Sequence, residues 1–479
     1  MNGKNKFLLI GAASFFTVSC QYSAYGQTKL KAQSRPNVLI ILADDMGYGD
    51  LGCYGSQSIE TPNIDELASQ GMRFTRFYSG SAVSSPSRAC LLTGKFPLRF
   101  DIREAFKDST DFLVTESVTL PELLKKEGYA TAHIGKWHLG GLRPMDVARR
   151  QEGKPALPGP LQHGFDYYLT NIEGAPLRPR LIRERKLYRE GGKYLLENDK
   201  HIPEIKKYWE EIKVDKAIEL LGQWKDKKQP FFLNMWFDTP HTPYEPAPEP
   251  HLSKYAKIGV TGDQLYFRSM VSCFDENIGR LIQALIDKNL YENTIIIFTS
   301  DNGPAFQGSP GPFKGGKTDL HEGGIRVPAF VIWPGHIPAG ANTFETGHMA
   351  DIFPTVCEAL NIKDVPSDLD GTSILPLLTA KTDKIDHGIL LWQMDLMLHY
   401  QNQGIKPTPY VTTVATKGNW KMTADGDVPK ELFNLAQDHR ELYNLLGKEP
   451  EIEKELSEAI KRFLNEPRQK YDEKLGMYN

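Results

Sequence analysis

The chain has 479 residues, a length that predicts two or more domains. Hydrophobic residues make up 40% of the chain and charged residues 24%, which is the composition of an ordinary globular protein. The formal net charge of -3 at pH 7 gives no electrostatic reason to expect binding to nucleic acid or to an anionic membrane.

The first 26 residues are expected to be a signal peptide. Two lysines precede an apolar run at residues 7–18, which is too short to cross a bilayer. Cleavage after Ala24-Tyr25-Gly26 would release an exported, periplasmic protein without a transmembrane anchor. The alternative is a weak lipobox at residues 17–20 that would place a lipid on Cys20 and anchor the protein at the cell envelope. Because the usual first leucine of a lipobox is missing, we favour the unanchored form.

Four apolar runs are expected to form buried strands of a parallel or mixed sheet, and polar side chains follow each of them. The runs are residues 36–42, 129–134, 231–236 and 294–299. The polar side chains that follow are Asp44 and Asp45, Lys136 and His138, His241, and Asp301 and Asn302. In open α/β sheets the ligand crevice lies beyond the carboxyl ends of the strands. We therefore expect these side chains to share one site.

Helical patterns separate the strands, at residues 62–70, 120–127 and 270–285, and Thr119 with Glu122 forms a capping box for the second helix. From about residue 386 the pattern changes to short alternating strands at 411–416, 420–422 and 431–435, followed by an amphipathic helix at 450–464. We expect a catalytic domain at residues 35–385 and a smaller α+β subdomain with an antiparallel sheet at residues 386–479.

Residues 311–318 match the Walker A pattern of nucleotide triphosphatases, but the flanking sequence argues against a nucleotide site. A P-loop joins a hydrophobic strand to a helix whose N-terminus holds phosphate. The residues before the pattern, 305–310, have no strand character, and residues 319–324 have no helical character. We reject the nucleotide interpretation.

A serine-rich stretch at residues 84–95, Ser-Ser-Pro-Ser-Arg-Ala-Cys-Leu-Leu-Thr-Gly-Lys, places Ser84 just before a helical turn that Gly94 can end. In isolation such a segment is most often a solvated capping turn. The full stretch resembles the signature of the type I sulfatases, Cys or Ser followed by x-Pro-Ser-Arg and a Leu-Thr-Gly-Arg/Lys tail. In that family the first residue is oxidised to formylglycine, whose hydrate is the nucleophile. The resemblance implies that Ser84 is the modified catalytic residue.

Further motifs occur in the order that this family has them: the paired aspartates, Gly-Lys-Trp-His, Pro-His-x-Pro, Asp-Asn and Gly-Lys with Glu-Gly-Gly. The resemblance implies an alkaline-phosphatase-like α/β/α sandwich with a large mixed central sheet. Oxygen ligands favour a hard cation, Ca²⁺ or alternatively Mg²⁺, over zinc. The expected metal ligands are Asp44, Asp45, Ser84, Asp301 and Asn302.

The resemblance also implies roles for the remaining polar groups. Arg88 and Lys136 match the residues that orient the formylglycine hydrate and the sulfate. His138 matches the base that regenerates the aldehyde after sulfur has been attacked. His241 and Lys317 match the residues that contact the bridging oxygen and protonate the departing alcohol. The neighbouring His321 is interpreted as a loop histidine without a catalytic role.

Serine in place of the commoner cysteine departs from the usual form of the motif. It implies a bacterial enzyme matured by an anaerobic radical formylglycine-generating maturase. The expected substrate is a sulfated carbohydrate, attacked in an exo manner at sulfated galactose or hexosamine units. The residues expected to contact it are Asp101, Arg103, Arg178, Arg180 and Trp392.

Two alternative functions stay open. A phosphomonoester or phosphonate hydrolase of the same superfamily would use unmodified Ser84 as its nucleophile, usually with two metals and additional His and Asp ligands. A non-catalytic carbohydrate-binding surface protein could have kept the same fold.

Overall fold

The computed structural model describes residues 35–106, 111–172, 195–202, 207–395 and 411–468. The expected signal peptide, with Cys20, and the segment that holds Arg178 and Arg180 lie outside the described residues. None of the helices in the described ranges combines the length and the hydrophobicity needed to span a lipid bilayer.

The centre of the fold is a ten-stranded mixed sheet with the order β10-β2-β9-β8-β1-β7-β3-β4-β5-β6. Its middle consists of five parallel strands: β8 (Thr294–Ser300), β1 (Asn37–Ala43), β7 (Phe231–Trp236), β3 (Ala130–Gly135) and β4 (Tyr167–Asn171). The flanking strands, several of them antiparallel, are β2 (Met72–Tyr78), β9 (Ala329–Ile332), β10 (Ala341–His348), β5 (Leu195–Glu197) and β6 (Lys200–His201). The four predicted strands are therefore confirmed, and they are immediate neighbours.

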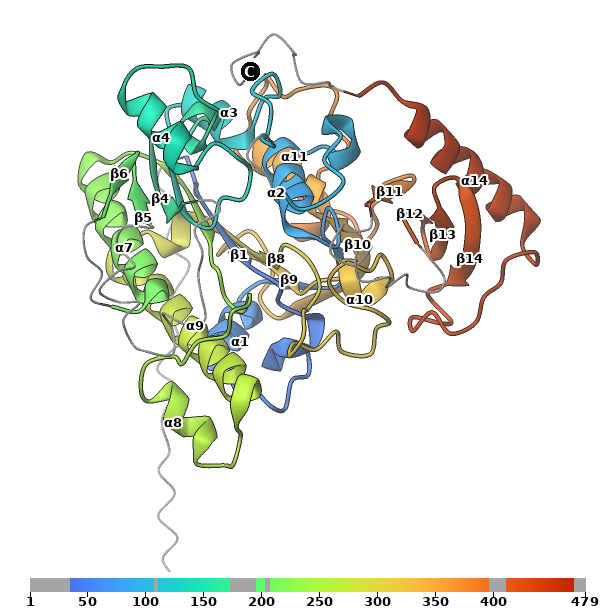
Figure 1. Ribbon diagram of the computed structural model, residues 1–479, viewed down its shortest axis with the longest axis horizontal. Coiled ribbons are helices and arrows are strands. Elements are labelled where there is room, and N and C mark those ends of the chain that lie inside the picture. The colour runs from blue at the N-terminus through green and yellow to red at the C-terminus, as the bar shows by residue number, and fades with distance from the viewer. Residues whose placement is uncertain (1–34, 107–110, 173–194, 203–206, 396–410, 469–479) are drawn as a thin grey trace, which may run out of the picture. The chain divides into compact units, whose positions relative to one another are not determined.

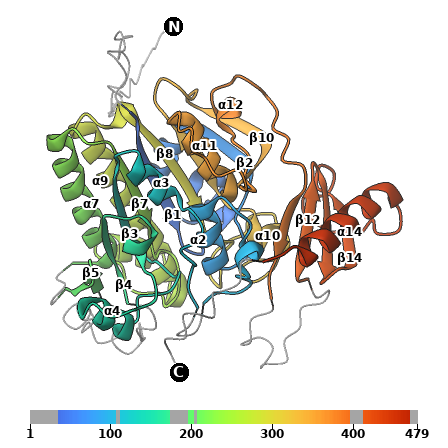
Figure 2. The ribbon, with the colours of Figure 1, turned by 90° about the horizontal axis from the view of Figure 1, so that it is seen from above.

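Helices cover both faces of this sheet, which explains why its central strands are continuously apolar. Along β1, Val38 and Ile40 point to one core, whereas Leu39 and Ile41 point to the other, because successive side chains alternate across a strand. The first core is shared with α2 (Ser84–Thr93), α3 (Leu120–Lys126), α11 (Ile352–Ala359) and α12 (Leu375–Leu378). The second is shared with α1 (Pro62–Ser69), α7 (Trp209–Lys227) and α9 (Gly262–Asp287). Figure 2 shows α7 and α9 on one side of β1 and β8, with α2 and α11 on the other.

The predicted helices are confirmed, with one boundary shifted. Thr119 and Glu122 form the expected capping box at the start of α3. Helix α9 begins at Gly262, eight residues before the predicted start at Met270. Most residues in the first two turns of α9 are exposed or only partly buried, with Phe267 as their buried apolar residue, so hydrophobic spacing alone did not reveal them. The described residues also form the short helices α4 (Pro144–Gln151), α8 (His251–Ala256) and α10 (Glu322–Ile325).

A second, smaller sheet is antiparallel and has the order β11-β12-β13-β14 (Figure 1). Its strands are β11 (Leu390–Gln393), β12 (Thr413–Lys417), β13 (Trp420–Asp425) and β14 (Val428–Asn434), and α14 (Pro450–Asn465) packs against them. Met422 and Leu432 of the sheet share a core with Leu456 and Ile460 of the helix. The three predicted strands and the predicted helix are confirmed, and β11 is an additional edge strand.

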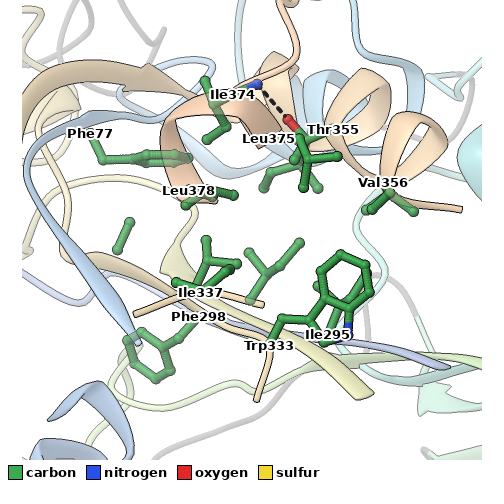
Figure 3. Close-up of a pocket in the computed structure, with 15 residues that line it drawn as sticks. Phe77, Ile295, Phe298, Trp333, Ile337, Thr355, Val356, Ile374, Leu375 and Leu378 are labelled. Carbon is green, nitrogen blue, oxygen red and sulfur yellow. Dashed lines mark hydrogen bonds between the residues drawn. The ribbon is translucent and has the colours of Figure 1, made fainter. Parts of the chain in front are cut away.

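An apolar cavity of about 20 Å³ lies between the large sheet and helices α11 and α12 (Figure 3). Ile295, Trp333, Val356 and Leu378 are among the side chains that line it. A water molecule needs polar partners to occupy such a space, and this lining is apolar. None of the predicted site residues lines this cavity, so it is a packing gap and not part of the predicted site.

Candidate active site

The paired aspartates and the Asp-Asn pair meet because β1 and β8 are adjacent parallel strands in register, with Ala43 opposite Ser300. The backbone N–H of Asp45 donates to Asp301 Oδ1 at 3.1 Å, and Asn302 Nδ2 donates to Asp45 Oδ1 at 2.8 Å. Asp45 adopts a left-handed backbone conformation, with φ of 63°, which turns its side chain back over the strand ends. Both pairs are buried.

These residues fit a hard cation. Asn302 is fully buried, and its Oδ1 accepts no hydrogen bond from any described residue. An orphaned buried carbonyl oxygen beside three carboxylates is a donor set that suits Ca²⁺ or Mg²⁺. Asp44, Asp45 and His241 also offer ligand atoms that lie within 4.8 Å of one another. The family resemblance implied a catalytic role for His241, and its place beside the possible metal ligands was not predicted.

Ser84 is the first residue of α2. The sequence had placed it in the loop just before the helix, so the helix begins one residue earlier than predicted. Its side chain is 2% exposed, and its Oγ lies 3.4 Å from Asp44 Oδ1 and 3.4 Å from Lys136 Nζ. Every residue of α2 is buried, and Gly94, with φ of 67°, ends the helix as predicted. The helix therefore holds Ser84 firmly against the aspartates.

Two cations, the buried Arg88 and the partly buried Lys136, pair with the aspartates next to Ser84. Arg88 Nη2 donates to Asp301 Oδ2 at 2.8 Å and lies 3.5 Å from Asp44 Oδ2, while its Nη1 donates to the backbone oxygen of Lys136. Lys136 Nζ donates to Asp44 Oδ2 at 2.6 Å. Burial by itself raises the pKa of Asp44, but the charges of Lys136, His241 and Arg88 outweigh it and hold that pKa below its usual value. The Asp44 carboxylate thus stays ionised inside the protein.

Lys317 and His241 form the opposite side of the site. Lys317 Nζ donates to Asp45 Oδ2 at 2.8 Å and lies 3.1 Å from His241 Nε2. Burial lowers the pKa of Lys317, but Asp45 and Asp44 raise it above the usual value overall. Lys314 points elsewhere and pairs with Glu431 Oε1 at 3.2 Å. The Walker-like residues lie in an irregular loop between β8 and α10, which is not the setting of a P-loop.

His138 lies at the end of β3 in a left-handed backbone conformation, with φ of 58°. Its Nε2 is 3.1 Å from the backbone oxygen of Phe106, and its Nδ1 has no hydrogen-bond partner among the described residues. Burial, with the nearby charges of Lys136 and Arg88, holds the pKa of His138 well below its usual value. The ring is therefore neutral, with Nδ1 as its unpartnered nitrogen.

The residues expected to contact a substrate fall into two groups. Arg103 Nε lies 3.0 Å from Asp101 Oδ1, and Arg103 Nη1 lies 3.0 Å from Asp395 Oδ2, in a partly exposed charged cluster. Trp392, by contrast, is 1% exposed, donates from Nε1 to Ser79 O at 2.8 Å and packs edge-on against Tyr78. We correct the expectation for Trp392, because a side chain enclosed in this way supports the core and presents no surface to a sugar.

A buried ion cluster beneath the His241 loop was not predicted from the sequence. Lys213 is fully buried and pairs with both Glu210 and Asp238. Glu210 also accepts a hydrogen bond from the hydroxyl of Thr239, whose backbone oxygen accepts one from the N–H of Asp44. The spacing of three residues between Glu210 and Lys213 on one helix was the available signal, but it is equally typical of exposed pairs.

Comparison with known proteins agrees with this geometry. The family model described as Sulfatase matches residues 36–362, and the model described as N-sulphoglucosamine sulphohydrolase, C-terminal, matches residues 316–470. N-acetylgalactosamine-6-sulfatase of Canis lupus familiaris is 34% identical over 391 residues, which are 77% of this chain and 71% of that protein. Arylsulfatase A of Homo sapiens is 32% identical over 469 residues, which are 89% of this chain and 86% of that protein.

Solved structures show the same relationship. The crystal structure of Ps i-CgsB in complex with k-i-k-neocarrahexaose matches with a TM-score of 0.76 and 28% identity, covering 90% of this chain and 93% of that one. The phosphonate monoester hydrolase of Agrobacterium radiobacter, with a TM-score of 0.63 and 23% identity, shares the fold alone. The Sulfatase family model spans well over half of the residues of this chain. The chain therefore belongs to the sulfatase family, which consists of sulfuric ester hydrolases of the alkaline-phosphatase-like superfamily.

Proposed function

We propose that the protein hydrolyses O-sulfate esters of glycans, using a formylglycine made from Ser84 and a bound Ca²⁺. The observation that carries this proposal is that Lys136, Arg88 and Lys317 all pair with the aspartates at two strand ends, directly beside the buried Ser84. Lys136 Nζ lies within hydrogen-bond distance of both Asp44 and Ser84 Oγ, and Arg88 bridges Asp44 and Asp301. Such fixed, desolvated positive charge suits a dianionic transition state, because it needs no reorganisation during the reaction.

Oxygen atoms of Asp44, Asp45, Asp301 and Asn302, together with the modified Ser84, would hold the cation, with Mg²⁺ as the alternative ion. The orphaned Oδ1 of Asn302 supports this assignment. A bound hard cation supplies Lewis acidity, which polarises a sulfate oxygen.

The proton-carrying groups are divided between the two sides of Ser84. On one side, Lys317 Nζ and His241 Nε2 are 3.1 Å apart, so one proton can be held between them and delivered to the leaving alcohol. On the other side, Nδ1 of His138, which has no hydrogen-bond partner among the described residues, is the atom that would accept a proton. Arg88 and Lys136 orient the Ser84 side chain and the sulfate and carry no proton in this scheme.

The substrate class is proposed from the relatives. One is named for N-acetylgalactosamine-6-sulfate, and a structural neighbour at 28% identity was solved with k-i-k-neocarrahexaose. We infer an exo-acting enzyme on sulfated galactose or hexosamine units, with Asp101 and Arg103 at the rim of the site. Residues 1–26 would direct its export, after which it would either be free in the periplasm or be anchored at the cell envelope by a lipid on Cys20. An anaerobic radical maturase would activate it.

The experiment that tests the chemistry is the mass of the tryptic peptide Phe77–Arg88 from protein purified from its natural host. A loss of two hydrogens at Ser84 is expected, together with sulfate release from galactose 6-sulfate or N-acetylgalactosamine 6-sulfate. Ser84→Ala should abolish release, whereas the control Ser69→Ala, at an exposed serine on α1, should not. If Ser84 were entirely unmodified in active protein, the proposal would be wrong, and a phosphohydrolase that uses the unmodified serine would take its place.

A further inference from the structure

Phe306 is an exposed aromatic residue on the irregular loop between β8 and α10, and its side chain is 79% exposed. Single exposed apolar residues are common on protein surfaces, so exposure alone means little. Phe306, however, also has φ of 44°, in the left-handed region that bulky side chains rarely adopt. Such strain persists only where the surroundings impose it, and it concentrates at functional positions.

The backbone around Phe306 is held by contacts on both sides. Gly308 N donates to Ala305 O at 3.0 Å, which closes a tight turn with Phe306 near its tip. The hydroxyl of Tyr244 donates to Ala305 O at 3.3 Å and accepts from Gln307 N at 3.2 Å. Gln264 of α9 donates to the side chain of Gln307 at 2.7 Å. The turn is therefore fixed, and it presents the ring to solvent.

The turn also adjoins the candidate active site. Phe306 follows the metal-ligand candidate Asn302 by four residues, a span of at most about 14 Å. The backbone oxygen of Pro304 accepts from Lys317 N at 2.8 Å, and Tyr244, which clamps the turn, follows His241 by three residues. Phe306 thus lies on the side of Lys317 and His241, where the proposed function places the departing alcohol and hence the sugar.

We propose that Phe306 is a stacking surface for the sugar unit that adjoins the sulfated sugar of a glycan substrate. The proposal rests on the proposed function, since it extends the sugar-binding side of the same site. The C–H face of a pyranose ring is weakly positive and apolar, and it complements the negative face of an aromatic ring. A rigid ring loses little conformational freedom when it binds in this way.

The test compares Phe306→Ala with Phe344→Ala, a control at an aromatic residue that is 78% exposed on β10, three strands away from β8. The substrates are N-acetylgalactosamine 6-sulfate and a tetrasaccharide with the same sulfated sugar at its non-reducing end. The ratio of the KM for the tetrasaccharide to the KM for the monosaccharide should rise roughly tenfold in F306A and stay unchanged in F344A. Phe306→Tyr should restore the ratio. An unchanged ratio in F306A would overturn the proposal, as would an equal loss on both substrates.

Binding separates this inference from the proposed function. In the Ser84→Ala background, the Kd for the tetrasaccharide should be roughly tenfold weaker when F306A is added, but not when F344A is added. If the unmutated protein releases no sulfate from either sugar, the proposed function fails. The Kd comparison then decides the role of Phe306 by itself, because equal Kd values in the two double variants would refute it.

Discussion

Lys421 offers the sharpest test of how the small sheet is joined to the loop between β8 and α10, which carries Lys317. It is fully buried on β13, and its Nζ lies 2.9 Å from Glu322 Oε1 and 2.9 Å from Glu441 Oε1. Both contacts are ion pairs, and Glu322 Oε1 also accepts a hydrogen bond from Lys421 Nζ. Glu322 opens α10, immediately after the loop that carries Lys317.

Lys421→Met removes the positive charge and keeps most of the volume, leaving two carboxylates buried together. Breaking a buried ion pair by removing one partner costs about 3–5 kcal/mol. Glu322 keeps its hydrogen bonds from Tyr78 and Arg326, so we expect the lower end, about 3 kcal/mol of unfolding free energy. The added change Glu441→Gln should recover a substantial part of that loss, because it removes the like charge.

Urea unfolding followed by tryptophan fluorescence would measure these differences. The matched control is Lys417→Met on β12, whose ion pair with Glu455 is 45% and 42% exposed and should contribute less than about 1 kcal/mol. If K421M were as stable as K417M, the buried network would not hold the two parts together and the reasoning would be wrong.

Three further outcomes are expected. Burial lowers the pKa of His321, but hydrogen bonds with Asp319 and Glu431 raise it to about 9 overall. The protonated ring therefore stabilises the fold fully below about pH 6.5, and this contribution is lost as the pH rises through 9. The difference in unfolding free energy between wild type and His321→Gln should therefore shrink by about 3 kcal/mol over that range, and a constant difference would contradict the pairing. Chelation with EDTA should abolish sulfate release, and Ca²⁺ should restore it better than Zn²⁺; full activity in demonstrably metal-free protein would rule out the cation. Trp392→Phe should lower stability by about 1 kcal/mol through loss of the bond to Ser79 and leave KM unchanged, whereas a raised KM at unchanged stability would make Trp392 a substrate contact after all.

Local sequence patterns were sufficient for the central strands and for most helices. A strand buried on both faces must be apolar throughout, so β1, β3, β7 and β8 were visible as continuous runs. The flanking strands were not predicted, because β2 mixes arginine with aromatic residues and β10 is an edge strand of mixed composition. The polar residues after each central strand pointed to a common site, because parallel strands place their carboxyl ends together.

The sequence by itself thus determined the nature of the central strands, the caps of helices such as α3, and which chemical groups follow each strand. Only the tertiary structure decided that Asp45 meets Asp301 across 256 residues, that His241 joins the aspartates, and that Trp392 is enclosed. The physical reason is the distance along the chain over which each effect acts. Propensity, capping and periodicity act over a few residues, whereas strand order, burial and ion pairing such as that of Lys421 with Glu322 depend on packing between segments that are far apart in the chain.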